Sequence, residues 1–134
     1  MKIYALDTNI LLLLLHRDEK VTKTRNEWLQ AGNSFVIPPI ADYEIQRGLF
    51  YTPSSRKEKV YFTLREHYTV GEMHPQTWVL AAKIYSDLRK KGFTIEDDDI
   101  FIAAFCLFND YPLITRNIKH FENIAGLRCV NWVD

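Results

Sequence analysis

The chain has 134 residues, of which 47% are hydrophobic, 13% aromatic and 25% charged. This length allows one domain with a real core and is too short for two ordinary domains, and the composition excludes a disordered chain. The 17 basic and 17 acidic residues cancel, so the global charge does not indicate a nucleic-acid-binding protein, although it allows a local basic surface.

The chain carries neither a membrane-spanning pattern nor a cysteine framework. Its longest apolar run, residues 10–15, is far shorter than the roughly 20 residues that cross a bilayer. This run also lacks the length and the small-residue cleavage site of a signal peptide, so the sequence predicts a cytoplasmic protein without membrane association. Cys106 and Cys129 show no paired metal-binding spacing and are predicted to be plain buried thiols.

The first half of the chain alternates strand-like and helical patterns. The predicted elements are a strand over residues 2–6, helices over 8–15 and 21–31, a strand over 34–37, and helices over 40–50 and 53–68. Gly32 suits the end of the second helix, and Pro38 and Pro39 stop the second strand. Ser55 and Glu58 have the spacing of a capping box, which predicts a helix start there.

The second half continues the alternation. The predicted elements are a short strand over residues 69–73, helices over 74–92 and 97–109, a strand over 112–115, a short helix over 118–124 and a strand over 127–132. Alternating strands and helices predict an α/β fold, with a central, mostly parallel sheet flanked by helices on both faces. No linker, repeat or low-complexity segment interrupts the pattern, so we expect a single domain over residues 1–134.

Acidic and polar residues follow the predicted strands, where open parallel sheets bind their ligands. Asp7 ends the first strand, "TRN" (residues 115–117) ends a later one, and "EDDD" (residues 96–99) opens a helix. Glu44 joins them if its helix begins at the same edge. Carboxylates without a His or Cys pattern suit Mg²⁺ or Mn²⁺. Each feature also has a plainer interpretation, as a helix cap, a surface charge, a dipole partner or a turn.

Helical geometry separates the three consecutive aspartates. At about 100° per residue, the apolar stripe of the helix over residues 97–109 consists of Ile100, Ala103, Ala104 and Leu107. Asp99 is predicted to project along the edge of this stripe, Asp98 to point nearly opposite it into solvent, and Asp97 to cap the helix. Asp99 is therefore the best candidate for an inward-facing metal ligand.

Several stretches of the chain, in order and over nearly its full length, match a known family. They are "YALDTNILL", "YEIQRG", "GFTIEDDDIFIAAFC", "LITRNIKHFENIAGL" and the closing "VNW". The chain resembles the PIN-domain ribonucleases, and specifically the VapC toxins of bacterial toxin–antitoxin pairs.

The resemblance implies which residues form the site. It places the three catalytic and metal-binding acids on Asp7, Glu44 and Asp99, and it implies Mg²⁺, or Mn²⁺, as cofactor. Many PIN domains have a fourth acid where this chain has Asn117, so the number of metal ions stays open. The residues expected to support the acids are Thr8, Asn9, Thr115 and Asn117, with Asp97, Asp98 and Glu122 as further candidates. The residues expected to contact RNA are Arg47, Arg116 and Lys119.

The implied activity is metal-dependent hydrolysis of RNA phosphodiester bonds. The implied partners are an RNA substrate, a VapB-type antitoxin and a second copy of the chain in a homodimer. Leu49, Phe50 and Tyr51, with Trp28, can form a groove for the antitoxin or belong to the core. Two other functions stay open: a housekeeping RNA-processing nuclease, and a PIN-like module that binds RNA or protein without catalysis. The sequence leaves the RNA and the cleaved bond undefined.

Overall fold

The protein is described by a computed structural model that covers residues 2–134, so Met1, the first residue of the predicted domain, lies outside the described residues. The strands are β1 Ile3–Leu6, β2 Ser34–Ile37, β3 Thr69–Val70, β4 Leu113–Ile114 and β5 Cys129–Val130. They form one sheet in the order β3-β2-β1-β4-β5, and every neighbouring pair is parallel. This confirms the predicted parallel sheet.

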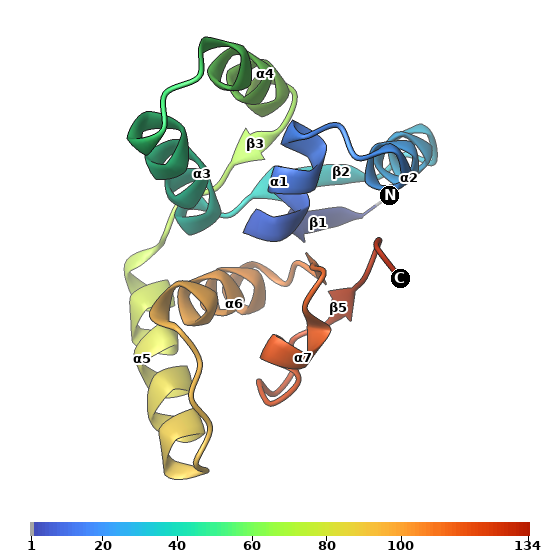
Figure 1. The fold of residues 1–134 in the computed structure, drawn as a ribbon. Helices are drawn as coiled ribbons and strands as arrows, with labels where there is room; N and C mark the ends of the chain where they lie inside the picture. The colour runs from blue at the N-terminus through green and yellow to red at the C-terminus, as the bar shows by residue number, and fades with distance from the viewer. Residues whose placement is uncertain (1) are drawn as a thin grey trace.

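Helices cover both faces of the sheet. Their bounds are α1 Thr8–Leu15, α2 Glu19–Gln30, α3 Pro39–Tyr51, α4 Ser55–Glu66, α5 Pro75–Lys90, α6 Asp97–Asn109 and α7 Ile118–Phe121. The chain steps from β1 through β2 to β3 in one direction and from β3 to β4 and β5 in the other. Right-handed crossovers therefore place the two sets of connecting helices on opposite faces. Figure 1 shows α3 and α4 in the upper part of the view, α1 at the level of β1 and β2, and α5, α6 and α7 in the lower part.

Most predicted boundaries hold within two residues, except that β3 and α7 end three residues earlier than predicted, at Val70 and Phe121. Gly32 has a φ of 94° and follows α2, as predicted. The helix itself begins earlier than predicted because the carboxylate of Asp18 accepts a hydrogen bond from the Val21 backbone N–H at 3.0 Å. The capping box was wrong: the hydroxyl of Ser54, not Ser55, accepts the capping hydrogen bond, from the Lys57 N–H.

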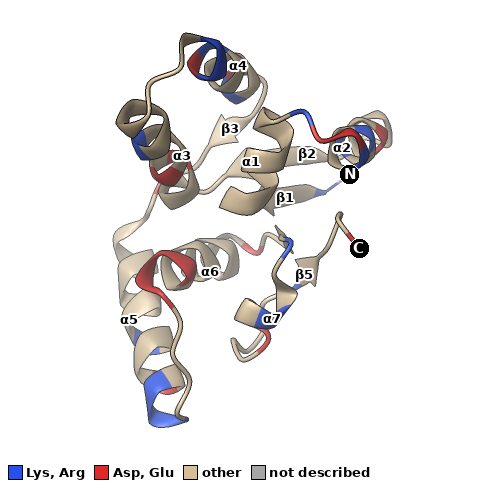
Figure 2. Cartoon of the chain, viewed as in Figure 1, with Lys and Arg blue, Asp and Glu red and all other residues tan. Residues whose placement is uncertain are grey.

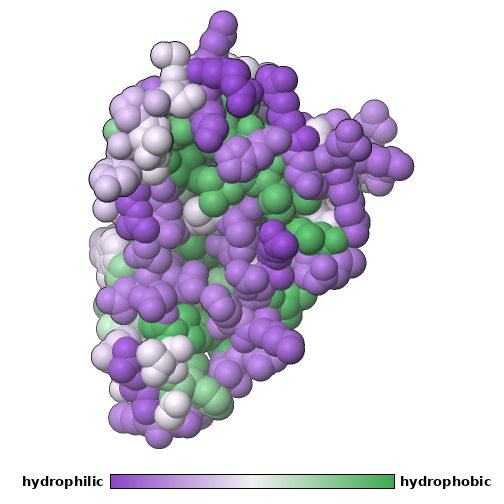
Figure 3. Space-filling view, viewed as in Figure 1, coloured by the Kyte–Doolittle hydropathy of each residue, from purple (hydrophilic) through white to green (hydrophobic). Residues whose placement is uncertain are grey.

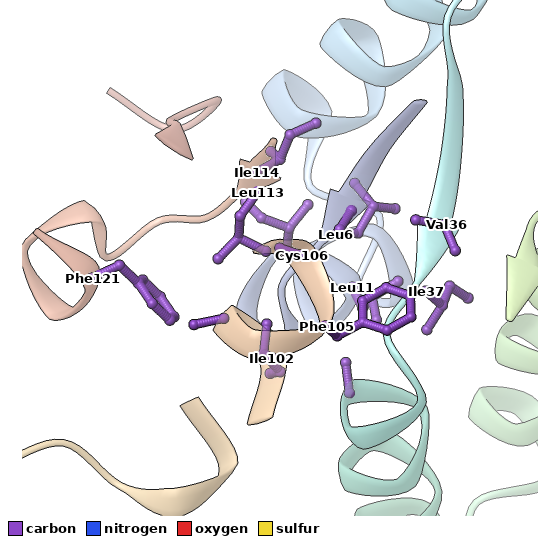
Figure 4. Close-up of a cluster of buried hydrophobic side chains, with 14 of the residues drawn as sticks. Leu6, Leu11, Val36, Ile37, Ile102, Phe105, Cys106, Leu113, Ile114 and Phe121 are labelled. Atoms are coloured by element: carbon purple, nitrogen blue, oxygen red, sulfur yellow. The ribbon is translucent and has the colours of Figure 1, made fainter. Parts of the chain in front are cut away.

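The core lies on both faces of the sheet, under α6 on one face and under α1 and α3 on the other. Figure 4 shows Leu6, Val36 and Leu113 from three strands around α6, which contributes Ile102 and Phe105. Over residues 2–134, none of the helices combines the length and apolar character that crossing a membrane requires.

The two cysteines differ in burial. Cys106 is fully buried, as predicted, whereas Cys129 is only half-buried, so the prediction for Cys129 holds in part. Burial raises the pKa of both thiols, that of Cys129 to about 11, which keeps them protonated at neutral pH.

A buried carboxylate, Asp42, ties α3 to α4. The guanidinium of Arg65 donates to both of its oxygens, from Nε at 2.9 Å and from Nη2 at 3.1 Å. The hydroxyl of Tyr61 donates to it at 2.6 Å, and the side-chain amide of Gln46 donates at 2.9 Å. Burial alone would raise the pKa of Asp42, but these donors outweigh it and lower that pKa overall. Asp42 therefore stabilises the fold as a charged group.

Gly71, just after β3, packs directly against the ring of Phe105. A Cβ at position 71 would lie 2.3 Å from the ring Cζ of Phe105, whose side chain is only 2% exposed. We expect Gly71→Ala to lower the free energy of unfolding by about 1–3 kcal/mol, measured by urea denaturation. The matched control is Gly48→Ala in α3, where a Cβ meets nothing within 4 Å. That variant should gain about 0.5–1 kcal/mol, so equal effects would contradict the packing argument.

Candidate functional site

The site begins where β1 and β4 end side by side. The backbone N–H of Asp7 donates to the carbonyl of Ile114 at 2.9 Å, which brings the ends of the two strands together. Thr115 follows β4, and its hydroxyl donates to Oδ2 of Asp7 at 2.8 Å. Two residues that lie 108 positions apart in sequence therefore meet at one edge of the sheet.

Asp7 is buried and held by several donors. Its side chain also accepts from the Thr8 backbone N–H at 2.8 Å and from the Asn9 side-chain amide at 3.4 Å. Burial raises the pKa of Asp7, although the hydrogen bonds from Thr115 and Thr8 lower it. The nearby charge of Asp99 raises it further. Asp7 is thus a fixed carboxylate whose charge is only partly compensated.

Glu44 reaches the same edge from α3. This helix starts at Pro39, directly after β2, so its first turns stand over the ends of the strands. The Thr8 hydroxyl donates to Oε1 of Glu44 at 2.7 Å. Burial raises the pKa of Glu44 in spite of this hydrogen bond, and the charge of Asp98 raises it as well. Thr8 therefore binds two of the three predicted acids, Asp7 through its backbone N–H and Glu44 through its hydroxyl.

Asp99 stands in the first turn of α6 and faces α7. Its Oδ2 lies 3.5 Å from Nδ1 of His120, and its side chain is 25% exposed. Burial raises the pKa of Asp99, whereas the neighbouring His120 lowers it. His120 was missed by sequence reasoning. The available signal was its position in "TRNIKHF", on the short helix directly after the strand that carries Thr115.

The prediction that Asp98 points into solvent was wrong. Its Oδ2 lies 3.7 Å from Nη2 of Arg47, and the same nitrogen lies 3.6 Å from Oε2 of Glu44. The helix is buried on this side too, because Ile102 and Phe105, one and two turns along, are 1% and 2% exposed. Asp98 thus faces α3 instead of open solvent.

The start of α6 also differs from the prediction. Glu96 occupies the N-cap, without a capping side-chain hydrogen bond, and Asp97 is the first helical residue. Figure 2 shows the acidic start of α6 below the acidic stretch of α3, with the basic end of α5 further down. The start of α6 therefore carries four consecutive carboxylates, with Glu96 just before the helix and Asp97, Asp98 and Asp99 in its first turn.

The acids lie in pairs, and the structure does not arrange three of them around one point. The charge of Asp99 raises the pKa of Asp7, and the charge of Asp98 raises the pKa of Glu44. Among residues 2–134, no three His, Cys, Asp or Glu side chains are placed so that they could hold a metal ion. Mg²⁺, however, commonly binds one or two carboxylates and keeps several waters. The oxygen donors of Asp7 and Asp99, one buried and one half-buried, fit that requirement.

The other predicted residues occupy the rim. Asn117 donates its backbone N–H to the Thr115 hydroxyl at 3.0 Å, while its side chain is exposed. The Arg116 backbone N–H donates to Oδ1 of Asn9 at 3.1 Å, which ties this loop to α1. The side chains of Arg116, Lys119 and Glu122 are exposed. None of these side chains touches the acids through a hydrogen bond or ion pair in the described part of the chain.

A polar cleft of about 460 Å³ opens beside the acids. Glu44, Asp98 and Asp99 line it together with Arg47 and Arg89. Of the residues predicted to contact RNA, only Arg47 lines this cleft. Arg89 comes from the end of α5 and was not among the residues predicted to contact RNA.

Of the two interpretations of Leu49, Phe50, Tyr51 and Trp28, a groove or part of the core, the core interpretation holds for Leu49 and Trp28. Leu49 is buried, whereas Phe50 and Tyr51 are exposed on α3. The Trp28 ring packs at the core margin, with ring centroids 4.8 Å from Tyr4 and 5.3 Å from Trp132. A groove of about 1340 Å³ instead lies between α2 and α4. In Figure 3, apolar atoms lie among polar ones over α1, between these two helices.

The raised pKa values predict a stability effect at the site. A raised carboxylate pKa means that the folded state is favoured below the unfolded pKa of about 4, and that this advantage is lost as pH rises through the folded pKa. At pH 7 in EDTA, Asp99→Asn should therefore have a free energy of unfolding about 1 kcal/mol higher than the wild type, measured by urea denaturation. The two proteins should converge near pH 3.5. A variant that is less stable than the wild type at pH 7 would contradict this.

Comparison with known proteins identifies the family. The PIN-domain family model matches residues 4–127. The chain is 31% identical to ribonuclease VapC1 of Haemophilus influenzae strain R2866, over 97% of this chain and 98% of the relative. It superimposes on VapBC-1 from nontypeable H. influenzae with a TM-score of 0.87 at 28% identity, covering 98% of this chain and 99% of that one. VapBC2 from Rickettsia felis, bound to a DNA fragment from its promoter, gives a TM-score of 0.89 at 24% identity over 97% and 98% of the two chains, which supports the fold alone. The chain therefore belongs to the PIN-domain family and, within it, to the VapC ribonucleases.

Proposed function

We propose that the protein is an Mg²⁺-dependent endoribonuclease, the toxin of a VapBC-type pair, and that residues 1–134 form its single PIN domain. The observation that carries this proposal is the buried carboxylate of Asp7, fixed by Thr115 and Thr8 beside Asp99. Asp7 and Asp99 both have raised pKa values, because the neighbouring His120 does not offset the effect of burial on them. A divalent cation stabilises such a pair of carboxylates.

Asp7 and Asp99 would hold the metal in this proposal, and Glu44 would serve as the base beside them. The bound Mg²⁺, or Mn²⁺, supplies neutralisation of the phosphate charge and a more acidic water. Thr115 and Thr8 hold the Asp7 oxygens in place by hydrogen bonds, and the Thr8 hydroxyl fixes Glu44. Glu44 accepts a proton from the attacking water, for which its raised pKa makes it a better base than an ordinary glutamate.

RNA binds over the acids in this proposal, with its phosphates on the basic rim. Arg47 lines the cleft, and Arg116 and Lys119 stand exposed beside Asn117. Positive side chains around a negative centre offset the repulsion between the carboxylates and the RNA backbone.

The test is cleavage of total RNA by the purified protein with Mg²⁺ and with EDTA. Cleavage with Mg²⁺ that stops in EDTA and returns with Mg²⁺ or Mn²⁺ supports the proposal. Intact RNA under every condition, together with normal growth of cells that express the protein, would overturn it.

We further propose that a VapB-type antitoxin binds the groove between α2 and α4 and that the toxin is a homodimer. The floor of the groove contains Leu14 and Leu64, and Arg25 and Arg56 stand on its rim. Basic and apolar lining suits an amphipathic segment with acidic residues.

Leu64→Glu should weaken capture of the co-expressed antitoxin by about tenfold or more, since it buries an unpaired charge in the interface. The homodimer is tested by the molar mass of the purified toxin, measured by light scattering.

A further inference from the structure

Two exposed arginine–tyrosine pairs border the polar cleft. On α3, the guanidinium carbon of Arg47 lies 5.3 Å from the ring centroid of Tyr43. On α5, that of Arg89 lies 4.8 Å from the ring centroid of Tyr85. Each pair spans one helical turn, and both arginines line the cleft that Glu44 also lines.

Stability does not explain these pairs. Tyr43 is 57% exposed and Tyr85 is 42% exposed, so neither ring contributes a full share of core packing. A cation–π contact at an exposed site is worth only about 0.5–1 kcal/mol. Large aromatic rings that remain in solvent beside cations are better suited to a ligand that has both planar rings and negative charge.

Both guanidinium groups keep hydrogen-bonding capacity for such a ligand. Arg89 has no carboxylate within ion-pair distance in the part of the chain that the structure describes. Arg47 contacts Glu44 at 3.6 Å and Asp98 at 3.7 Å, well beyond the roughly 2.7–2.9 Å of a strong charge-assisted hydrogen bond. A phosphate can therefore bind either arginine while the aliphatic stem and the ring stay in place.

We propose that Tyr43–Arg47 and Tyr85–Arg89 bind a single-stranded segment of RNA across the cleft, an inference that rests on the proposed ribonuclease function. Bases stack on the tyrosine rings, and the flanking phosphates bind the two arginines. The phosphodiester between them then passes over Asp99 and Glu44. A duplex hides the faces of its bases and cannot use the tyrosines, so the two pairs select unpaired RNA.

The test is fluorescence anisotropy of a labelled, unstructured RNA of roughly 12 nucleotides, and of the same strand in a duplex, with the full chain in EDTA. Tyr85→Leu and Tyr43→Leu should each weaken binding of the single strand about 5- to 100-fold, whereas Tyr85→Phe should keep it within about twofold. Arg89→Gln should lower the slope of log affinity against log salt by about 0.7. Duplex binding should be weaker and insensitive to both tyrosine substitutions.

The chain offers matched controls. Tyr51→Leu removes an even more exposed tyrosine from α3, and Lys90→Gln removes the cation next to Arg89. Both should bind the single strand as the wild type does. Equal losses in the controls, or wild-type affinity in Tyr85→Leu and Tyr43→Leu, would overturn the inference.

Three further outcomes distinguish failure of this inference from failure of the proposed ribonuclease function. RNA cleavage by the wild type with no effect of either tyrosine on binding overturns the inference and leaves the ribonuclease function in place. Loss of the dimer in light scattering, with unchanged RNA binding, assigns the tyrosines to a contact between copies and also overturns it. A wild type that neither binds nor cleaves RNA overturns both.

Discussion

Asp99→Asn should lower the rate of RNA cleavage at saturating Mg²⁺ by at least about 100-fold. Substitution of a residue that hydrogen-bonds to a metal ligand lowers metal affinity or activity by about 10- to 100-fold. The loss of a proposed ligand itself should cost at least as much. Asp99 has His120 as its one ion-pair partner in the described chain, so an amide can take the same position without disturbing the fold. The measurement is the initial rate of cleavage of a labelled RNA, and isothermal calorimetry of Mg²⁺ binding serves as a second readout.

Asp98→Asn is the matched control, one residue away in the same turn of α6. Asp98 faces Arg47 and Glu44 instead of Asp7, so its loss should leave most of the activity, although it removes the contact to Arg47 and one of the charges that raise the pKa of Glu44. A fall in rate as large as that of Asp99→Asn would show that the assignment of the inward carboxylate is wrong. A wild-type rate in Asp99→Asn would contradict the proposed metal site itself.

The sequence predicted the sheet edge well because that edge depends on local patterns. Short apolar runs followed by Asp7 and by Thr115 mark strand ends, and parallel strands bring their ends together. The hydrogen bond between these two residues, at 2.8 Å, follows from that arrangement. Their catalytic and metal-binding roles stay predictions, as does the role of Glu44.

Asp98 shows where the local pattern was insufficient. The stripe led by Ile100 suggested a helix with one buried face, but α6 packs against both α5 and α3. Its second face, with Ile102 and Phe105, is therefore buried as well. Helical periodicity gives the angle between two side chains, and only the packing of neighbouring helices decides which of those directions is solvent.

The contact between His120 and Asp99 and the cleft between α3, α5 and α6 are long-range features of the same kind. No spacing along the chain brings Arg89 near Glu44, because it is the packing of both α5 and α3 on α6 that places the two residues at one cleft. The basic end of α5 was therefore not predicted to belong to the site. The fold converts it into one wall of the cleft.

Arg65→Met should lower the free energy of unfolding by about 3 kcal/mol at pH 7, measured by urea denaturation. It leaves the buried carboxylate of Asp42 without its bidentate partner, and removing one member of a buried ion pair costs about 3–5 kcal/mol. The low end applies because the Arg65 side chain is 36% exposed. Lys59→Met, at an exposed position of the same helix, should change stability by no more than about 0.5 kcal/mol.

The pH dependence of that loss tests its electrostatic origin. In the wild type the folded pKa of Asp42 is lowered, so its stabilisation is complete above the unfolded pKa of about 3.9 and is lost as pH falls through the folded pKa. Without Arg65, burial dominates and raises the folded pKa of Asp42, so its contribution is lost instead as pH rises through that pKa. The difference between wild type and Arg65→Met should therefore shrink as the pH is lowered from 7 toward about 3.5. A difference that stays constant over this range would mean that Arg65 stabilises the junction of α3 and α4 through packing of its aliphatic stem, and not through the charge of Asp42.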